Sequence, residues 1–252
     1  MREAADAAGR RDTWRKMTWR ELRNVCRRRS DYLITLFLTN ELSLILTWFL
    51  VRTRVTPNQV TITSILCAFL CGVAYGMGYF VIGSALLFLS HVLDCTDGNL
   101  ARAKRLFSPL GKWLDAVGDR LGETFVFLGA ALYFLQGEGS LAWTCATLFS
   151  ALLLALYYYL VDMGLALGIS SPTQALGGLE ARGVHIKWGI MEPVIYGFVI
   201  LTPLGWIKIQ ILLVAAMAAG GILYQGVRRI RQLRGVCKVS GEETGQEQEL
   251  ES

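Results

Sequence analysis

The chain has few charged residues for its length and almost no histidine. Asp, Glu, Lys and Arg make up 18% of the 252 residues, whereas hydrophobic residues make up 53% and the mean hydropathy is +0.42. This apolar content exceeds what the core of one soluble domain requires and favours a membrane protein. With only His91 and His185, and six cysteines that lack CxxC spacing, the sequence argues against a zinc site. The cysteines are interpreted as small apolar fillers.

Residues 1–30 lack the short apolar core of a cleavable signal and are crowded with arginine instead, so we expect the start of the chain to be retained. Apolar residues recur among these arginines at near-helical intervals. They are Trp14, Met17, Trp19, Leu22 and Cys26. Residues 13–50 are therefore predicted to form an amphipathic region at the membrane interface. The alternative is that residues 32–51 form a seventh span, which Asn40 and Glu41 near its centre argue against.

Six apolar stretches follow, each near the ~20 residues that span a bilayer as a helix. They are residues 57–76, 79–101, 112–135, 140–167, 188–204 and 207–227. The loops around residues 102–112 and 182–187 carry Lys and Arg, so they are expected to face the cytoplasm. An even number of spans then places both termini in the cytoplasm. The predicted fold class is an all-α membrane protein with six transmembrane helices and an N-terminal amphipathic juxtamembrane region.

The sequence divides into three regions of different composition. Residues 1–55 are the basic and interfacial region, and residues 56–235 are the six-helix core. Residues 236–252 form an acidic tail that is expected to be disordered, because it has almost nothing apolar to bury. Within the core, residues 168–186 are rich in Gly, Ser and Pro and are expected to form a cytoplasmic loop.

Four aspartates occur as two pairs at helical spacing. Asp94 and Asp97 are three residues apart. Asp115 and Asp119 are four apart, so each pair projects from one face of a helix. The link at residues 103–110 is short, which predicts that the two helices are antiparallel neighbours meeting at their cytoplasmic ends. The four carboxylates are then brought together.

The crowded carboxylates predict a bound cation. A charged side chain at the centre of a transmembrane helix costs roughly 2.5–3.5 kcal/mol, and like charges also repel one another. Oxygen ligation by carboxylates alone favours a hard ion, so Mg²⁺ is the leading candidate and Mn²⁺ the second. The small residues Gly98, Ala101 and Gly111 lie beside the aspartates and leave room for a ligand, although such residues also promote ordinary packing between membrane helices.

These residues form the pattern D-x2-D-G-x2-A-R-x8-G-x3-D-x3-D over residues 94–119. The pattern resembles the signature of the CDP-alcohol phosphotransferase family, and all eight fixed positions are present. A chance match at one start has a probability of roughly one in ten billion by composition alone. The six-helix layout of the family, with an N-terminal amphipathic segment, is similar to the arrangement predicted for residues 13–230.

The resemblance implies an enzyme that cleaves the diphosphate of a CDP-linked alcohol, transfers the phosphate-bearing group to a second alcohol and releases CMP. By the same resemblance, Asp94, Asp97 and Asp115 would hold metal against the diphosphate. Asp119 would accept the proton of the acceptor hydroxyl and would also contact metal.

A nucleotide site is implied in the same way. Gly98, Ala101 and Gly111 would admit the cytidine. Arg102 would pair with a phosphate or with a motif carboxylate, because its guanidinium forks onto either.

Residues 56–61 also resemble the entry to the first span in the family, where Asn58 would contact the nucleotide. The alternative is a helix start, with Thr56 as N-cap and Pro57 at the first helical position. His91, one helical turn before the first aspartate, is predicted to pack or to support a ligand rather than to bind metal.

The acceptor site is harder to predict. Arg182 and Lys187 lie on the same predicted side as the aspartates and are candidate ligands for an acceptor phosphate, or alternatively cytoplasmic anchors. Glu192 and Asp162 are acids within predicted spans that either line the cavity or pair structurally.

The predicted function is phospholipid synthesis, with CDP-diacylglycerol as donor and an acceptor such as glycerol phosphate, inositol phosphate or serine. One alternative is the same chemistry with a soluble CDP-polyol or CDP-amino alcohol. Another is a divalent-cation transporter, but a permeation path requires polar residues at matching depth in several spans, whereas these aspartates crowd at one face. By resemblance, a homodimer within membrane lipids is expected, and no nucleic-acid partner.

Overall fold

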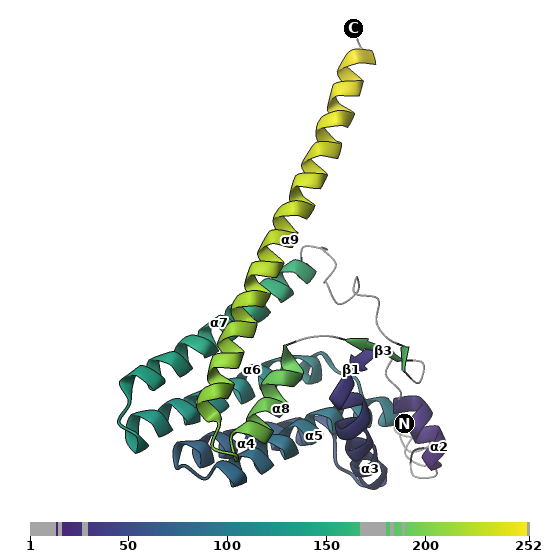
Figure 1. The fold of residues 1–252 in the computed structure, drawn as a ribbon. Coiled ribbons are helices and arrows are strands. Elements are labelled where there is room, and N and C mark those ends of the chain that lie inside the picture. Colours follow the sequence, from purple (N-terminus) through teal and green to yellow (C-terminus); the bar gives the residue numbers. More distant parts are fainter. Residues whose placement is uncertain are drawn as a thin grey trace.

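Helices make up most of this computed structural model, which describes residues 14, 17–26, 30–166, 180–181, 184–187 and 190–250 (Figure 1). The helices are α2 (Trp19–Cys26), α3 (Asn40–Leu50), α4 (Pro57–Gly76), α5 (Phe80–Lys104), α6 (Pro109–Leu132), α7 (Leu141–Ala166), α8 (Met191–Leu201) and α9 (Ile207–Leu250). Two π-helical turns, η1 (Thr35–Thr39) and η2 (Tyr133–Gly137), precede α3 and follow α6. The strands are β1 (Ser30–Tyr32), β2 (Glu180–Ala181) and β3 (Val184–Lys187).

Helices α4 and α6 begin with the same local device, a hydroxyl N-cap followed by proline. The side chain of Thr56 caps α4 ahead of Pro57, and a reciprocal bond from the third helical residue completes a capping box. Ser108 caps α6 ahead of Pro109. Between them, α5 ends where Arg105 adopts the left-handed conformation with φ 54°, which turns the chain sharply toward α6. The helix start predicted at residues 56–57 is thus present.

Helix α4 is the common neighbour of α5 and α6. It packs along both, whereas α5 and α6, all of whose residues are described, make almost no contact with each other outside the region of the aspartates. Small residues permit this arrangement: Ser64 and Ser90 exchange hydroxyl-to-carbonyl bonds of 3.1 and 2.9 Å between α4 and α5. The predicted side-by-side packing of the second and third helices is therefore corrected, because both pack on α4 rather than along each other.

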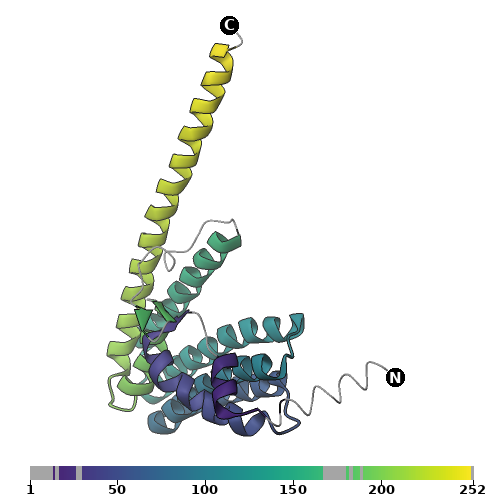
Figure 2. The same cartoon turned by 90° about the vertical axis from the view of Figure 1, so that its right-hand side faces the viewer.

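The flanking elements lie on two sides of these three helices. Figure 1 shows α2, α3 and β1 on one flank and α7 on the other, and Figure 2 shows α9 extending away from the remaining helices. Helix α7 packs mainly against α9, and α8 packs against both α5 and α9. A buried aromatic and aliphatic cluster joins α4 to α9 through residues such as Tyr75, Phe127 and Phe198.

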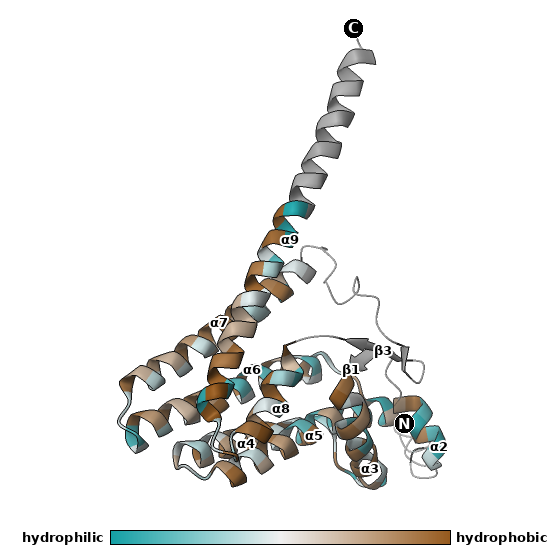
Figure 3. Cartoon of the chain, in the orientation of Figure 1, coloured by the Kyte–Doolittle hydropathy of each residue, from teal (hydrophilic) through white to brown (hydrophobic). Residues whose placement is uncertain are grey.

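Four helices are long and apolar enough to cross a membrane by length and composition. They are Pro57–Gly76, Phe80–Lys104, Leu141–Gly164 and Ile207–Arg231. In Figure 3, brown colouring marks hydrophobic residues along α7 and the first part of α9. Helix α6 is equally long but carries the second aspartate pair, and α8 has only 11 residues. An apolar, mainly helical membrane protein is therefore confirmed, whereas the number of six spans stays a prediction.

Helices α2 and α3 are folded against the core. Leu22 and Cys26 of α2 are buried with Leu44 of α3 and Leu100 of α5. The apolar helix Phe37–Leu50 is too short to count among the candidate spans. Thr18, which directly precedes α2, donates hydrogen bonds to the Glu21 carboxylate and thereby lowers the pKa of that carboxyl below its ordinary value.

Two segments differ from the prediction. Part of the loop predicted at residues 168–186 forms a small sheet of order β1-β3-β2, in which Ser30 pairs in parallel with His185. This pairing joins residues far apart in the chain, so no local sequence pattern predicts it.

At the C-terminal end, α9 continues to Leu250 through most of the tail predicted to be disordered. Glu, Gln and Lys in that stretch favour helix, and no proline interrupts it.

The crossing of α4 and α6 supplies a stability prediction. A Cβ atom on Gly129 would lie 2.1 Å from the carbonyl oxygen of Gly72, so Gly129→Ala forces the two backbones apart. We expect it to lower the free energy of unfolding by about 1–3 kcal/mol or more, measured by thermal unfolding in detergent. Gly122→Ala on the same helix is the matched control, because its Cβ would meet Ala68 at an ordinary 3.5 Å. Equal stability of both variants would contradict the close approach of α4 and α6 at Gly72 and Gly129.

Candidate active site

Helices α5 and α6 bring three of the four aspartates together. Oxygens of Asp94, Asp97 and Asp115 all lie within 4.8 Å of one another. Asp97 is buried, with 5% of its surface exposed, whereas Asp94 is half-buried and Asp115 is exposed. The group therefore combines one desolvated carboxylate with two that solvent or a ligand can reach.

Helix α4 contributes a hydroxyl to the same group. The Thr61 side chain donates a short hydrogen bond to the carboxylate of buried Asp97. Its oxygen also lies 3.2 Å from the Pro57 carbonyl, but the bond to Asp97 is shorter and charge-assisted. Thr61 lies within the segment that sequence analysis singled out, one helical turn after Pro57, but the pattern assigned it no role.

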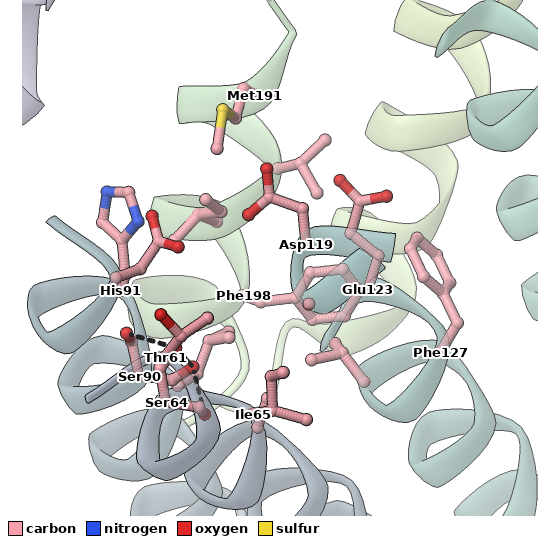
Figure 4. Close-up of a pocket in the computed structure, with 17 residues that line it drawn as sticks. Thr61, Ser64, Ile65, Ser90, His91, Asp119, Glu123, Phe127, Met191 and Phe198 are labelled. Carbon is pink, nitrogen blue, oxygen red and sulfur yellow. Dashed lines mark hydrogen bonds between the residues drawn. The ribbon is translucent and has the colours of Figure 1, made fainter. Parts of the chain in front are cut away.

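A pocket lies beside the aspartates between α4, α5, α6 and α8. Asp94 and Asp119 line it, together with His91 and Glu123. Figure 4 shows Asp119 and Glu123 projecting from one helix, with His91 on the other side of the pocket and the aromatic rings of Phe127 and Phe198 below. A few charged groups thus converge on a mainly apolar wall.

Asp119 is not part of the close group of three aspartates, but it lines two separate cavities. The second cavity is also lined by Asp115, Arg120 and Asp162. The carboxylate thus lies between the pocket beside α8 and the cavity beside α7. A base at this position can face a bound donor and still be open to an acceptor.

Glu123 is a site residue that the sequence analysis missed. It follows Asp119 by four residues, so the run Asp115, Asp119 and Glu123 marks one helical face and was a usable signal. The Arg120 guanidinium bonds the Glu123 carboxylate at 2.8 Å and stacks 3.8 Å from the ring centroid of Tyr158. Glu123 therefore enters the pocket as a paired acid.

His91 packs against η1 and α8. It is buried, its Nε2 lies 3.5 Å from the Thr35 hydroxyl, and its ring meets Tyr196 edge-on at 5.7 Å. Its nitrogen is also close enough to Asp94 and Cys95 for the three side chains to form a second potential ligand group.

The predicted nucleotide residues are distributed over α4, α5 and α6. A Cβ on Gly111 would lie 3.0 Å from the amide oxygen of Asn58, so a larger residue there would press on that side chain. Gly98, Ala101 and Arg102 are half-buried on α5. The structure thus places Asn58 beside Gly111, while Thr56 and Pro57 start the helix, so the two interpretations of this segment are compatible.

The predicted acceptor residues are only partly visible. Arg182 lies outside the described residues, and Lys187 is described only through its backbone, which pairs with Tyr32 in the sheet. Of the two acids left open, Glu192 accepts a 2.6 Å bond from the backbone N–H of Thr35, which is a structural contact. Asp162 lines the cavity beside Asp119.

The family pattern of the CDP-alcohol phosphatidyltransferases matches residues 54–223, from the start of α4 into α9. This chain belongs to that family. The match includes both aspartate pairs and every helix that lines the pocket, so the resemblance seen in residues 94–119 is confirmed over most of the chain. Members of the family are transferases.

Two relatives carry the same name. The phosphatidylinositol phosphate synthase of Cutibacterium acnes is 38% identical over 106 residues, which cover 39% of this chain and 50% of the relative. The phosphatidylinositol phosphate synthase of Streptomyces avermitilis is 29% identical over 190 residues, 74% of this chain and 75% of the relative. The chain thus spans half the length of the first relative.

Solved structures of the phosphatidylinositol phosphate synthase of Mycobacterium tuberculosis share the fold. The structure with CDP-DAG bound has a TM-score of 0.57 at 20% identity and covers 75% of this chain and 91% of that chain. The complex with manganese and citrate has a TM-score of 0.56 at 20% identity and covers 73% of this chain and 86% of that chain. At this identity the likeness shows the fold alone.

The bond from Thr61 to Asp97 generates a prediction about cation binding. We expect Thr61→Val to weaken Mn²⁺ binding about tenfold, because groups that support a ligand typically change metal affinity by 10–100-fold. Thr61→Ser keeps the hydroxyl and should bind Mn²⁺ like the unaltered protein. Titration followed by electron paramagnetic resonance measures both. An unchanged affinity in the Val variant would show that the hydroxyl does not support the site.

Proposed function

We propose that this protein transfers a phosphatidyl group from CDP-diacylglycerol to a hydroxyl of a phosphorylated polyol, of which inositol phosphate is the leading candidate, and releases CMP. The observation that carries the proposal is the convergence of Asp94, Asp97 and Asp115 beside a pocket that also contains Asp119. The names of the relatives and the CDP-DAG bound to the Mycobacterium tuberculosis enzyme support this donor and acceptor.

The donor set fits a divalent cation. Two unit charges 4 Å apart repel by about 4 kcal/mol at an effective dielectric constant of 20, so a trio of carboxylates this close strongly favours a counter-charge. Oxygen donors without nitrogen or sulfur suit Mg²⁺ or Mn²⁺. The manganese in the related structure supports this choice. When bound, such an ion neutralises the diphosphate and polarises the phosphorus for attack.

The residues of the chain then have separate tasks in the transfer. Asp94, Asp97 and Asp115 hold the cation, and Arg102 adds a fixed positive charge for the phosphates. The acceptor oxygen attacks the phosphorus that carries the lipid alcohol, and the bond between this phosphorus and the bridging oxygen breaks. The bridging oxygen leaves with CMP. Asp119 accepts the proton of the acceptor hydroxyl, for which its position between two cavities suits it.

The proposed orientation places the site at the cytoplasmic face, with six spans, cytoplasmic termini and a homodimer in the membrane. Basic residues gather near the aspartate end of α5 and α6. Lys208, in the first turn of α9, is paired with Glu138 at 2.7 Å. Arg182 and Lys187 remain candidate ligands for the phosphate of the acceptor.

A screen of donors against acceptors tests the function. Purified protein with Mg²⁺ is given CDP-diacylglycerol or a soluble CDP-alcohol, each with inositol phosphate, glycerol phosphate or serine, and CMP release is measured. The proposal expects CMP with CDP-diacylglycerol and inositol phosphate. Release only from a soluble donor would favour the soluble alternative. Cation flux in liposomes without CMP from any donor would favour transport.

The base assignment predicts the phenotype of Asp119→Asn. We expect turnover to fall by at least 10²-fold, because general base catalysis contributes about 10²–10⁴-fold, while nucleotide binding is largely kept. CMP release and CDP binding are both measured on the purified variant. Glu138→Gln is the control, since Glu138 pairs with Lys208 away from the aspartates. Full activity of Asp119→Asn would overturn the assignment.

The ligand assignment predicts a different phenotype for the other pair. Asp94→Ala and Asp97→Ala should weaken the Mg²⁺-dependent part of CDP binding, because each removes a carboxylate from the group of three. Calorimetry with Mg²⁺ and with a chelator separates this part from binding that needs no metal. An affinity equal to that of the unaltered protein would refute their role.

A further inference from the structure

A row of hydroxyl side chains runs along one face of η1 and α3. Thr35, Thr39, Ser43 and Thr47 are spaced four residues apart, and each is at most 3% exposed. Such spacing places them on one helical face. This buried polar face is turned toward the core, although the same segment carries exposed apolar residues elsewhere. Buried hydroxyls at these positions are therefore expected to form hydrogen bonds within the protein.

Ser43 is the member of this row that reaches the aspartate-bearing helix. Its hydroxyl oxygen accepts a 2.7 Å hydrogen bond from the Asn99 side-chain amide on α5. The oxygen of the same amide accepts a 2.6 Å bond from the Arg102 guanidinium. Asn99 is completely buried, and both ends of its side-chain amide have a hydrogen-bond partner.

The directions of these bonds are mutually consistent. Arginine can only donate, which assigns the oxygen of the Asn99 amide to Arg102 and leaves the amide nitrogen to donate to Ser43. The Ser43 hydroxyl in turn donates to the Asn40 carbonyl at 2.9 Å. In this series of hydrogen bonds from Arg102 to the backbone of α3, each group is therefore assigned as donor or acceptor in only one way.

A second contact ties the same row to the other end of the aspartate segment. Thr35 lies 3.5 Å from His91, one turn before Asp94, and its backbone is held by Glu192 of α8. The N-terminal segment therefore contacts α5 on both sides of the aspartate pair.

We propose that Ser43 and Asn99 are positioning residues that hold the Arg102 guanidinium ready for the phosphates of the donor. This inference rests on the proposed function, since it concerns the same site. A long arginine side chain loses conformational entropy when it binds a ligand. If other residues already hold the side chain in place, this entropy cost does not weaken the binding of the ligand. Ser43, which lies outside the family match at residues 54–223, thereby supports the active site.

Binding of CDP in the presence of Mg²⁺, measured by calorimetry on the full chain, tests the proposal. Ser43→Ala and Asn99→Leu should each raise the dissociation constant of CDP about tenfold, the size expected for one bond to a charged group. Ser43→Thr keeps the hydroxyl and should restore binding. Thr47→Val is the matched control, because the Thr47 hydroxyl bonds only the Ser43 carbonyl of its own helix among the described residues.

The deciding comparison uses Arg102→Ala as background. If Ser43 and Asn99 act through Arg102, neither substitution weakens CDP binding further once Arg102 is absent. The same loss in both backgrounds, an equal loss in Thr47→Val, or no loss in either single variant would overturn the proposal. If the unaltered protein does not bind CDP at all, the proposed function fails instead, which keeps the two failures distinct.

Discussion

Asp94, Asp97 and Asp115 project from two helices into a space of less than 5 Å, and this crowding of like charge constrains the rest of the structure. At about 4 kcal/mol for two unit charges 4 Å apart at an effective dielectric constant of 20, repulsion between neighbouring ionised carboxylates is a large fraction of the free energy of unfolding of a typical domain, about 5–15 kcal/mol. Structure on several sides must therefore hold the carboxylates in place. A divalent cation offsets the repulsion, and the same cation serves the chemistry of a diphosphate donor.

Helix α4 packs against both of the aspartate-bearing helices, α5 and α6. Its small residues let it approach both α5 and α6, and Thr61 adds a hydrogen bond to Asp97, the most buried of the three acids. Because α5 and α6 hardly pack on each other, the space between them stays available as a pocket. On the far side of α5, the N-terminal segment contacts His91 and Asn99. The site thus depends on residues well outside the aspartate pattern.

The sequence predicted what depends on local spacing. Apolar stretches of span length predicted the ends of the core helices to within about three residues, except the far end of α9, and the pattern at residues 94–119 identified the family. Contacts between distant segments could not be predicted in this way. The packing of α5 and α6 on α4, the pairing of β1 with β3, and the bond from Ser43 to Asn99 each join residues without a shared local pattern. Glu123 could have been predicted from the sequence, since it continues the four-residue spacing of Asp115 and Asp119.

The central claim is that one cation is shared by carboxylates of α5 and α6. Anomalous diffraction from crystals of the full chain grown with Mn²⁺ measures this directly. The account predicts a manganese peak in coordination contact with Asp94, Asp97 and Asp115 together. A peak bound by one helix alone, or no peak at the aspartates under conditions that support turnover, would contradict it.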